Sequence, residues 1–152
     1  MNEKEIAEYM RSHKIMQLAT SSKNKPWICS VFYTVDNEMN LFFISNPSRR
    51  HSLEIMKNKN VACAITDSSQ EVTKRKKGLQ IEGTVSLVTN EREIEFALNL
   101  WNESNSGLEK IINFKNYRKK KMEDKVYKIV PKNIKIFDEE MKGTTRIIEV
   151  KK

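Results

Sequence analysis

The segment that constrains the fold most strongly reads LFFISNPSRRH and occupies residues 41–51. Its first half is aromatic and aliphatic, which is typical of a β-strand. The Pro-Ser pair that follows predicts a change of element, with Ser48 as the N-cap of a helix. Arg49, Arg50 and His51 therefore fall in the first turn of that helix.

Three potential cations at a helix start are unfavourable, because the helix macrodipole already places partial positive charge there. A bound anion reverses the sign of this interaction. Free backbone N–H groups, the Ser48 hydroxyl and a guanidinium fork together form a suitable phosphate site. The alternative is that Arg49 and Arg50 simply project into water. The clustering favours the phosphate site.

A two-residue period runs through residues 27–35, upstream of this segment. One face carries Trp27, Cys29, Val31, Tyr33 and Val35, and the other carries Ile28, Ser30, Phe32 and Thr34. Because large apolar side chains occur on both faces, we expect this strand to be covered on both sides. The turn at residues 36–38 connects it to a returning strand at residues 39–45, which makes a β-hairpin.

The rest of the chain predicts further short strands and helices. Helices are expected at residues 3–13, from Ser48 to about 57, from Asn90 to about 103, and in a last stretch that ends near Lys120. Further strands are expected at residues 16–20, 61–66, 78–89, 125–130 and 133–138, while residues 144–150 either pair at an edge or trail off. Strands dominate and no linker divides residues 1–152. We therefore expect a single, mainly β (α+β) domain, a six- to seven-stranded antiparallel barrel with short flanking helices.

The composition is that of a soluble protein, with 38% hydrophobic and 32% charged residues. No apolar run approaches the roughly 18 residues of a membrane span, and the N-terminus has no secretory signal pattern, so we expect a cytoplasmic protein. Cys29 and Cys63 lie in apolar strand-like runs and are expected to be buried free thiols. His13 and His51 are isolated in the sequence, so no metal site is expected.

The formal net charge of +8 includes two basic clusters, at residues 74–77 and 118–121. Such an excess attracts any polyanion. Neither cluster has interleaved aromatic residues of the kind that single-strand binders use, although Tyr117 adjoins the second. A solvated loop and a helix end explain the clusters at least as well, so we do not expect nucleic-acid binding.

The order of these elements resembles that of the pyridoxamine-phosphate-oxidase-like flavin-binding split barrels, and in particular a short bacterial branch of unknown function. In that family a strand leads into a Ser-Arg-Lys motif whose residues hold the phosphate of flavin mononucleotide (FMN). The matching positions here are Ile44, Ser45, Ser48, Arg49 and Arg50. Arg50 stands in place of the usual lysine, and His51 is able to donate one more hydrogen bond.

Residues 26–33 resemble the family's strand whose backbone lines the isoalloxazine ring of the flavin. The resemblance implies that this wall includes Trp27, Val31, Phe32 and Tyr33, together with Ile44. A planar apolar ring needs such a water-poor surface. The alternative for Trp27 is that it is a plain core residue.

Residues 77–83 resemble the family's long strand, in which a polar side chain faces the flavin and a glycine lets the sheet bend. The matching residues are Gln80 and Gly83. Gln80 carries both a donor and an acceptor, which suits the pyrimidine edge of the ring. It can equally be an outward-facing polar residue of an alternating strand.

The resemblance implies a homodimer with two flavin sites at the interface, acting as an FMN-dependent oxidoreductase on an unknown small-molecule substrate. The chain departs from true pyridoxamine phosphate oxidases at residues 143–148, which lack the Arg-x-His segment that grips the substrate phosphate. No general acid or base stands out, and a flavin performs the redox step itself. The alternatives are a non-catalytic binder of haem or a deazaflavin on the same fold, or a basic nucleic-acid-binding module.

Overall fold

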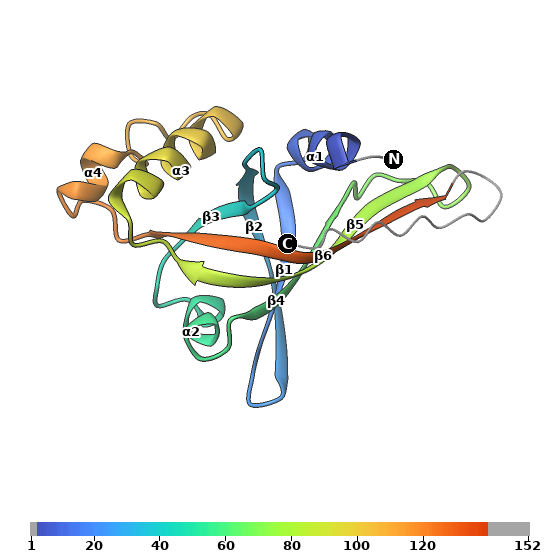
Figure 1. The fold of residues 1–152 in the computed structure, drawn as a ribbon, viewed down its shortest axis with the longest axis horizontal. Helices are drawn as coiled ribbons and strands as arrows, with labels where there is room; N and C mark the ends of the chain where they lie inside the picture. The colour runs from blue at the N-terminus through green and yellow to red at the C-terminus, as the bar shows by residue number, and fades with distance from the viewer. Residues whose placement is uncertain (1–2, 140–152) are drawn as a thin grey trace.

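The structure, a computed structural model, describes residues 3–139, and within this range the chain forms six strands and four helices (Figure 1). The strands are β1 (Ile15–Ser22), β2 (Lys25–Val35), β3 (Leu41–Ser45), β4 (Asn60–Thr66), β5 (Lys76–Leu87) and β6 (Lys125–Glu139). The helices are α1 (Glu3–Ser12), α2 (Arg50–Lys57), α3 (Glu91–Ser104) and α4 (Phe114–Arg118). All strand pairs are antiparallel and close a barrel in the order β1-β2-β3-β6-β5-β4. The predicted antiparallel barrel with short flanking helices is confirmed.

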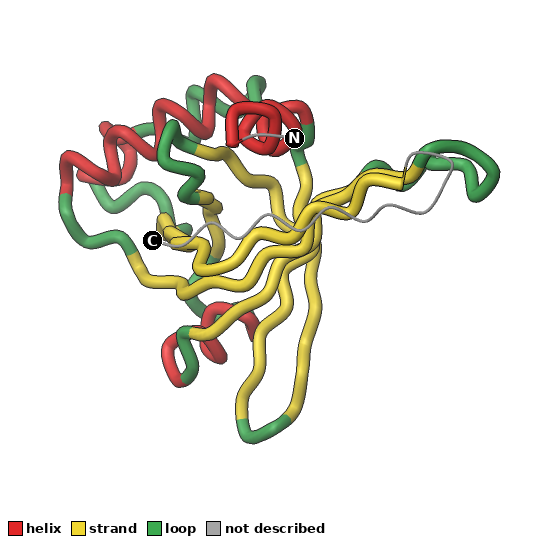
Figure 2. Tube along the Cα trace, turned by 45° about the vertical axis from the view of Figure 1, so that its right-hand side comes forward, coloured by secondary structure: helices red, strands yellow, loops and turns green. Residues whose placement is uncertain are grey.

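The helices lie at the periphery of the barrel, and two hairpins project from it (Figure 2). One projecting hairpin joins β1 to β2, and the other joins β4 to β5. Helix α3 packs on β2, β3 and β6, whereas α2 packs on β1, β2 and β5. No helix within residues 3–139 is both long and apolar enough to cross a membrane.

The alternation predicted for β2 separates the barrel interior from its outer surface. Tyr33 and Val35 are buried in the core, while the outward Ile28 and Phe32 are 61% and 53% exposed. The expectation that this strand is covered on both faces is therefore wrong for the described part of a single chain. The reason is that α3 reaches the strand near Thr34, at its C-terminal end, where the Thr34 hydroxyl lies within hydrogen-bond distance of Leu100 O and Ser104 Oγ.

The ladder between β2 and β3 is short and leaves part of β2 without a strand neighbour. It contains three residue pairs and begins at Tyr33 opposite Phe43, although β2 starts at Lys25. The Tyr33 N–H donates to Lys14 O on the β1 side. Because successive residues of a strand direct their N–H and C=O groups to opposite edges, Ile28, Ser30 and Phe32 direct theirs away from β1. Within the described strands nothing pairs with that edge, and this is the split of the barrel.

Several strand boundaries differ from the prediction, and for β3 and β5 local contacts give the reason. Strands β1 and β2 extend further into their connecting turn than predicted, to Ser22 and from Lys25, and β4 begins one residue earlier, at Asn60. The returning strand begins at Leu41 instead of residue 39, since Met39 has a positive φ of 63° and Asp36 Oδ1 accepts the N–H groups of Glu38 and Asn40. The long strand β5 occupies residues 76–87 instead of 78–89. Its first residue, Lys76, pairs with Glu139 of β6.

The two strands predicted on either side of Pro131 are one continuous strand, β6. Pro131 lies opposite Gly83, where the register between β5 and β6 shifts and forms a bulge. The ladder with β3 stops at Ile129, so the missing N–H of Pro131 costs no bond on that side. The segment 144–150, expected to pair at an edge or trail off, lies outside the described residues.

Helix α3 begins where the sequence predicts, whereas α4 ends earlier than predicted. Asn90 caps α3, and its Oδ1 accepts the N–H of Glu93. The buried apolar stripe of this helix consists of Ile94, Ala97, Leu98 and Trp101. Helix α4 is shorter than expected, because Lys120 adopts a positive φ of 53° after the helix ends at Arg118.

We predict that Gly83→Val destabilises the protein by about 1–3 kcal/mol, the usual range for overpacking. A Cβ at residue 83 would lie 2.7 Å from the backbone oxygen of Val130, so the bulge must shift. Gly78→Ala is the matched control, because its nearest contacts at 3.3 Å are side-chain atoms of Thr66. Urea unfolding of both variants provides the comparison, and equal stability of Gly83→Val and wild type contradicts the assigned packing.

Candidate functional site

The split of the barrel ends at the N-terminus of α2, which has no side-chain cap. The N-cap residue is Arg49, with extended φ and ψ, and it makes no capping hydrogen bond. The prediction that Ser48 is the N-cap is wrong. Ser48 is engaged in a local turn instead, in which both its N–H and its hydroxyl donate to Oδ1 of Asn46. Such side-chain turns compete with helix capping.

An uncapped start leaves the first N–H groups of a helix without intrahelical acceptors. In the same turn, Ser52 carries a buried hydroxyl for which the described residues provide no hydrogen-bond partner. Donors are therefore concentrated at this position without internal acceptors. A helix start with free N–H groups is able to bind an anion.

Arg50 is held in place by three other side chains. Its guanidinium lies over the Trp27 ring, 4.1 Å from the centroid, and its Nε donates to Oε1 of Glu54 at 2.9 Å. The other oxygen of Glu54 accepts a 2.5 Å hydrogen bond from the buried hydroxyl of Thr20. The arrangement joins the start of β2, the end of β1 and the first two turns of α2.

This contact leaves most of the donor capacity of Arg50 unused. Only Nε is committed to Glu54, and within the described residues neither terminal nitrogen donates to another group. The Arg50 side chain is 48% exposed, while that of Glu54 is 10% exposed. Arg50 thus presents a fixed, half-exposed fork, the geometry that binds carboxylate or phosphate through two hydrogen bonds.

The third potential cation, His51, is buried and bonded. Its Nε2 lies 2.7 Å from Oγ of Ser45, at the end of β3. Burial lowers the pKa of His51, the neighbouring Arg49 lowers it further, and Glu54 opposes the shift. The imidazole is therefore neutral near pH 7 and links β3 to α2. Residues 44–51, which run from the end of β3 into the start of α2, are called the α2 corner below. Its positive charge comes from Arg49 and Arg50.

The apolar wall predicted from residues 31–33 is divided between core and surface. Tyr33 belongs to the core, its hydroxyl donates to Met10 O, and its backbone oxygen accepts from the Asn105 amide. Val31 is partly buried against the same core, and Ile44 packs against a second apolar cluster beside α3. Phe32 is exposed on the outer face. Tyr33 is therefore a core residue whose backbone groups are already bonded, and the contact of β2 with the start of α2 is made by Trp27.

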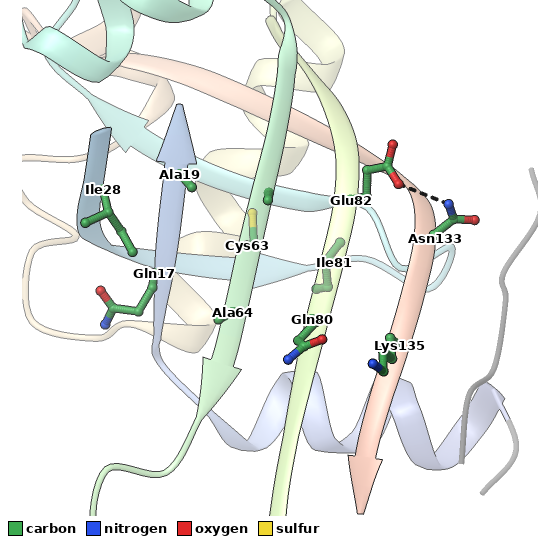
Figure 3. A pocket seen from close by; sticks show the side chains of 11 residues that line it. Gln17, Ala19, Ile28, Cys63, Ala64, Gln80, Ile81, Glu82, Asn133 and Lys135 are labelled. Carbon is green, nitrogen blue, oxygen red and sulfur yellow. Dashed lines mark hydrogen bonds between the residues drawn. The ribbon is translucent and has the colours of Figure 1, made fainter. Parts of the chain in front are cut away.

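Gln80 lies in a separate groove of about 440 Å³ on the outer surface of the barrel (Figure 3). The register places Gln80 between Ala64 of β4 and Lys135 of β6. Small side chains form the floor, and Ile28 and Gln17 stand at one end. None of residues 44–51 lines this groove. Within one chain, the structure therefore does not bring Gln80 together with the α2 corner.

Sequence reasoning missed Glu54 and Thr20, although one signal for the former was present. Glu54 follows Arg50 by four residues, which places both side chains on one helix face. Thr20 comes from a different strand, and its contact with Glu54 depends on how α2 crosses the end of the barrel. Within residues 3–139 no group of three or more His, Cys, Asp or Glu side chains is arranged to hold a metal ion.

Comparisons with known proteins agree with this architecture. The family model for pyridoxamine 5'-phosphate oxidase matches residues 3–135. A UPF0306 protein of Yersinia pseudotuberculosis is 30% identical over 89 residues, which is 58% of this chain and 60% of that protein. The chain thus spans less than two thirds of this relative.

Two solved structures share the fold at lower identity. HutZ, the haem storage protein of Vibrio cholerae, superposes with a TM-score of 0.70 and 19% identity, covering 90% of this chain and 93% of HutZ. A FAD-binding protein of Mesorhizobium loti superposes with a TM-score of 0.66 and 11% identity, covering 90% and 94%. Similarity at this identity shows the fold alone.

We predict that Glu54→Gln reduces the loss of stability in acid. Hydrogen bonds from Thr20 and then from Arg50 hold the pKa of Glu54 below its ordinary value of 4.5. The ionised carboxylate therefore stabilises the fold above about pH 4.5, and this contribution disappears as the pH falls through the lower, folded-state pKa. Melting temperatures measured from pH 6 to pH 3 should fall less for Glu54→Gln than for wild type.

Glu8→Gln, which removes an exposed carboxylate from α1, is the control for this measurement and should follow the wild-type profile. If Glu54→Gln and wild type lose the same number of degrees over this pH range, the ionised Glu54 network does not stabilise the folded protein.

Proposed function

The chain belongs to the pyridoxamine 5'-phosphate oxidase family, and from this membership together with the geometry of the split we propose that it binds FMN and acts as a flavin-dependent oxidoreductase. One observation carries the proposal. The free edge of β2 leads to the uncapped N-terminus of α2, where Arg49 and Arg50 supply positive charge. A flavin phosphate has an apolar planar ring at one end and an anion at the other, and this site offers a complement to each.

The phosphate would be held at the start of α2. Arg50 offers the free terminal nitrogens of a guanidinium that Glu54 and Trp27 already orient, so little side-chain entropy is lost on binding. Arg49 adds a second full charge beside it, and no side-chain cap competes for the N–H groups of the first turn. Charge-assisted hydrogen bonds of this kind contribute about 1.5–3 kcal/mol each.

The ring would lie along β2. The backbone groups of Ile28, Ser30 and Phe32 alternate donor and acceptor along an edge that β3 does not cover. A pyrimidine-like ring edge also alternates donors and acceptors, so a strand edge can pair with it as another strand would. Ile44 adds apolar surface at the end of β3. When bound, the flavin supplies the electron transfer, and these residues bind and orient it.

We also propose that the protein is a homodimer. Ile28 and Phe32 are exposed on the outer face of β2, and Ile15, opposite Phe32 on β1, is 43% exposed. These side chains adjoin the small-residue floor of the Gln80 groove, which makes this face unusually apolar for a surface. A second copy of the chain packed on this face covers the outer side of β2, which the sequence pattern predicts to be covered.

A haem ligand is a less suitable occupant of the same split, even though HutZ shares the fold. Haem iron in proteins takes an axial side chain, most often histidine. The sequence contains two histidines: Nε2 of His51 is bonded to Ser45, and His13 follows α1, outside the elements that form the split. A deazaflavin, in contrast, carries the same phosphate and a similar ring, so identifying the bound molecule by mass distinguishes it from FMN.

We predict that Arg49→Ala combined with Arg50→Ala lowers FMN affinity at least about tenfold, because two charge-assisted contacts to the phosphate are lost. Affinity is measured by quenching of flavin fluorescence. Riboflavin, which lacks the phosphate, is the ligand control and should bind the double variant and wild type alike. Lys57→Ala with Arg92→Ala removes the same net charge elsewhere and should retain FMN. Unchanged FMN affinity in the arginine variant overturns the phosphate assignment.

We predict that Phe32→Glu converts the dimer to a monomer, because each copy would have to bury an unpaired carboxylate in an apolar interface. Sedimentation velocity measures the mass of wild type and variant at equal concentration. Val72→Glu is the control, since Val72 is 81% exposed in the β4–β5 loop, away from this face. A wild-type protein that sediments as a monomer rejects the proposed interface.

A further inference from the structure

The two basic clusters of the sequence have different environments in the structure. In the first, Lys74 pairs with Glu71, Arg75 makes a bidentate pair with Asp138, and Lys76 pairs with Glu139. The fourth cation of this cluster, Lys77, lies 4.9 Å from the centre of the Tyr9 ring. The fold itself thus provides every cation of this cluster with a partner.

The second cluster has no such compensation. Lys115, Arg118, Lys119, Lys120 and Lys121 are exposed, and no carboxylate of residues 3–139 lies within ion-pair distance of any of them. Five like charges on one short segment repel one another. The C-terminal end of a helix of five residues compensates only a small part of this repulsion.

The segment that carries these cations is nevertheless held rigidly. The N–H groups of Lys119, Lys120 and Lys121 donate to the carbonyl oxygens of Lys115, Tyr117 and Asn116, which closes the turn after α4. Three asparagine amides donate to backbone carbonyls of the preceding loop: Asn102 of α3 to Ile112 O, Asn113 to Glu109 O, and Asn116 of α4 to both Lys110 O and Ile111 O. The cations are therefore displayed on a preorganised surface.

The cations border a groove that also contains an aromatic ring. The groove, of about 540 Å³, lies between α3 and α4 and is lined by Phe114, Lys115, Arg118, Lys119 and Glu95. Phe114 stacks on Tyr117 with an interplanar angle of 10°, and Arg118 and Lys125 lie over these two rings at 6.0 and 5.3 Å. The aromatic residues that the linear sequence does not interleave with the cluster are brought to it by the fold.

From this combination we propose that the α4 groove binds single-stranded nucleic acid. Proteins that bind single strands without sequence preference combine a cationic groove, which follows the phosphates, with aromatic faces on which bases stack. The three lining cations lie on α4 and its C-terminal end, so the phosphates follow that wall. Glu95 lies on the opposite wall, on α3, where its carboxylate can accept from base amino groups.

An acidic protein segment or an anionic membrane also complements positive charge. Neither explains the half-buried Phe114, which lines the groove with Tyr117 packed beside it and forms no protruding apolar anchor. The groove shares no lining residue with the start of α2, so variants in it test this inference separately from flavin binding.

The test is the binding of an oligothymidine of roughly 20 nucleotides to the full chain, followed by fluorescence anisotropy at several salt concentrations. We expect Arg118→Ser with Lys119→Ser to weaken binding at least about tenfold and to reduce the slope of log K against log salt by about 1.4, because two phosphate contacts are lost. Phe114→Leu should weaken binding about fivefold or more with the slope unchanged, since stacking does not release counterions.

Lys74→Ser with Lys76→Ser is the matched control. It removes the same net charge from the first cluster, which lies at the opposite end of the molecule from α4 (Figures 1 and 2). Near-wild-type binding by this control, together with loss in the α4 variants, supports the proposal. Equal weakening by both double variants shows attraction to the overall net charge and overturns it. Tighter binding of polyglutamate or of phosphatidylserine vesicles than of oligothymidine also overturns it.

Discussion

The arrangement of the candidate site depends on the shortness of one strand ladder. The β2–β3 pairing stops after three residue pairs, and β3 turns away into α2 at the point where pairing would continue along β2. A barrel normally satisfies every strand edge internally, so an open edge inside an otherwise closed sheet is costly unless water or a ligand occupies it. The same departure of β3 brings the start of α2 to the open edge. The free edge and the uncapped helix start therefore have one geometric cause.

The positive charge at the α2 corner is tolerated because one carboxylate, that of Glu54, compensates part of it. Oε1 of Glu54 accepts a hydrogen bond from Nε of Arg50, which leaves the two terminal nitrogens of Arg50 free. The Thr20 hydroxyl donates to the other oxygen of Glu54. The neutral His51 fastens the end of β3 to the same helix. Part of the repulsion that the sequence predicts at this helix start is thus removed internally. What remains for a ligand is the unbalanced charge of Arg49 and the unused donors of Arg50.

The features that were predictable from sequence are those set by neighbours along the chain. Alternation along the chain predicts β2, and the helix expected from Asn90 is α3, whereas the bend at Gly83 is implied by the family resemblance. Ser48 was misassigned because Asn46, two residues earlier, captures its side chain, and local rules rank both residues as good caps or turn formers. The position of Gln80 was beyond sequence reasoning for a different reason. A strand pattern predicts which residues face outward, but which part of the outer surface meets the ligand depends on the barrel closure and on what covers the exposed face of β2.

Charge provides the clearest case in which three-dimensional placement matters more than composition. A formal charge of +8 gives no indication of where an anion binds, and the two runs of four cations have the same composition in the sequence. The fold separates them by where it puts carboxylates. The β5–β6 ladder aligns Asp138 and Glu139 with the first run, because the register that packs the barrel core also sets these pairs. Among the described residues, no strand places a carboxylate within ion-pair distance of the cations around α4, and the asparagines of this segment bond to backbone carbonyls instead. Within residues 3–139, clustered positive charge is therefore found at the start of α2 and after α4, and these are the places where we propose that anionic ligands bind.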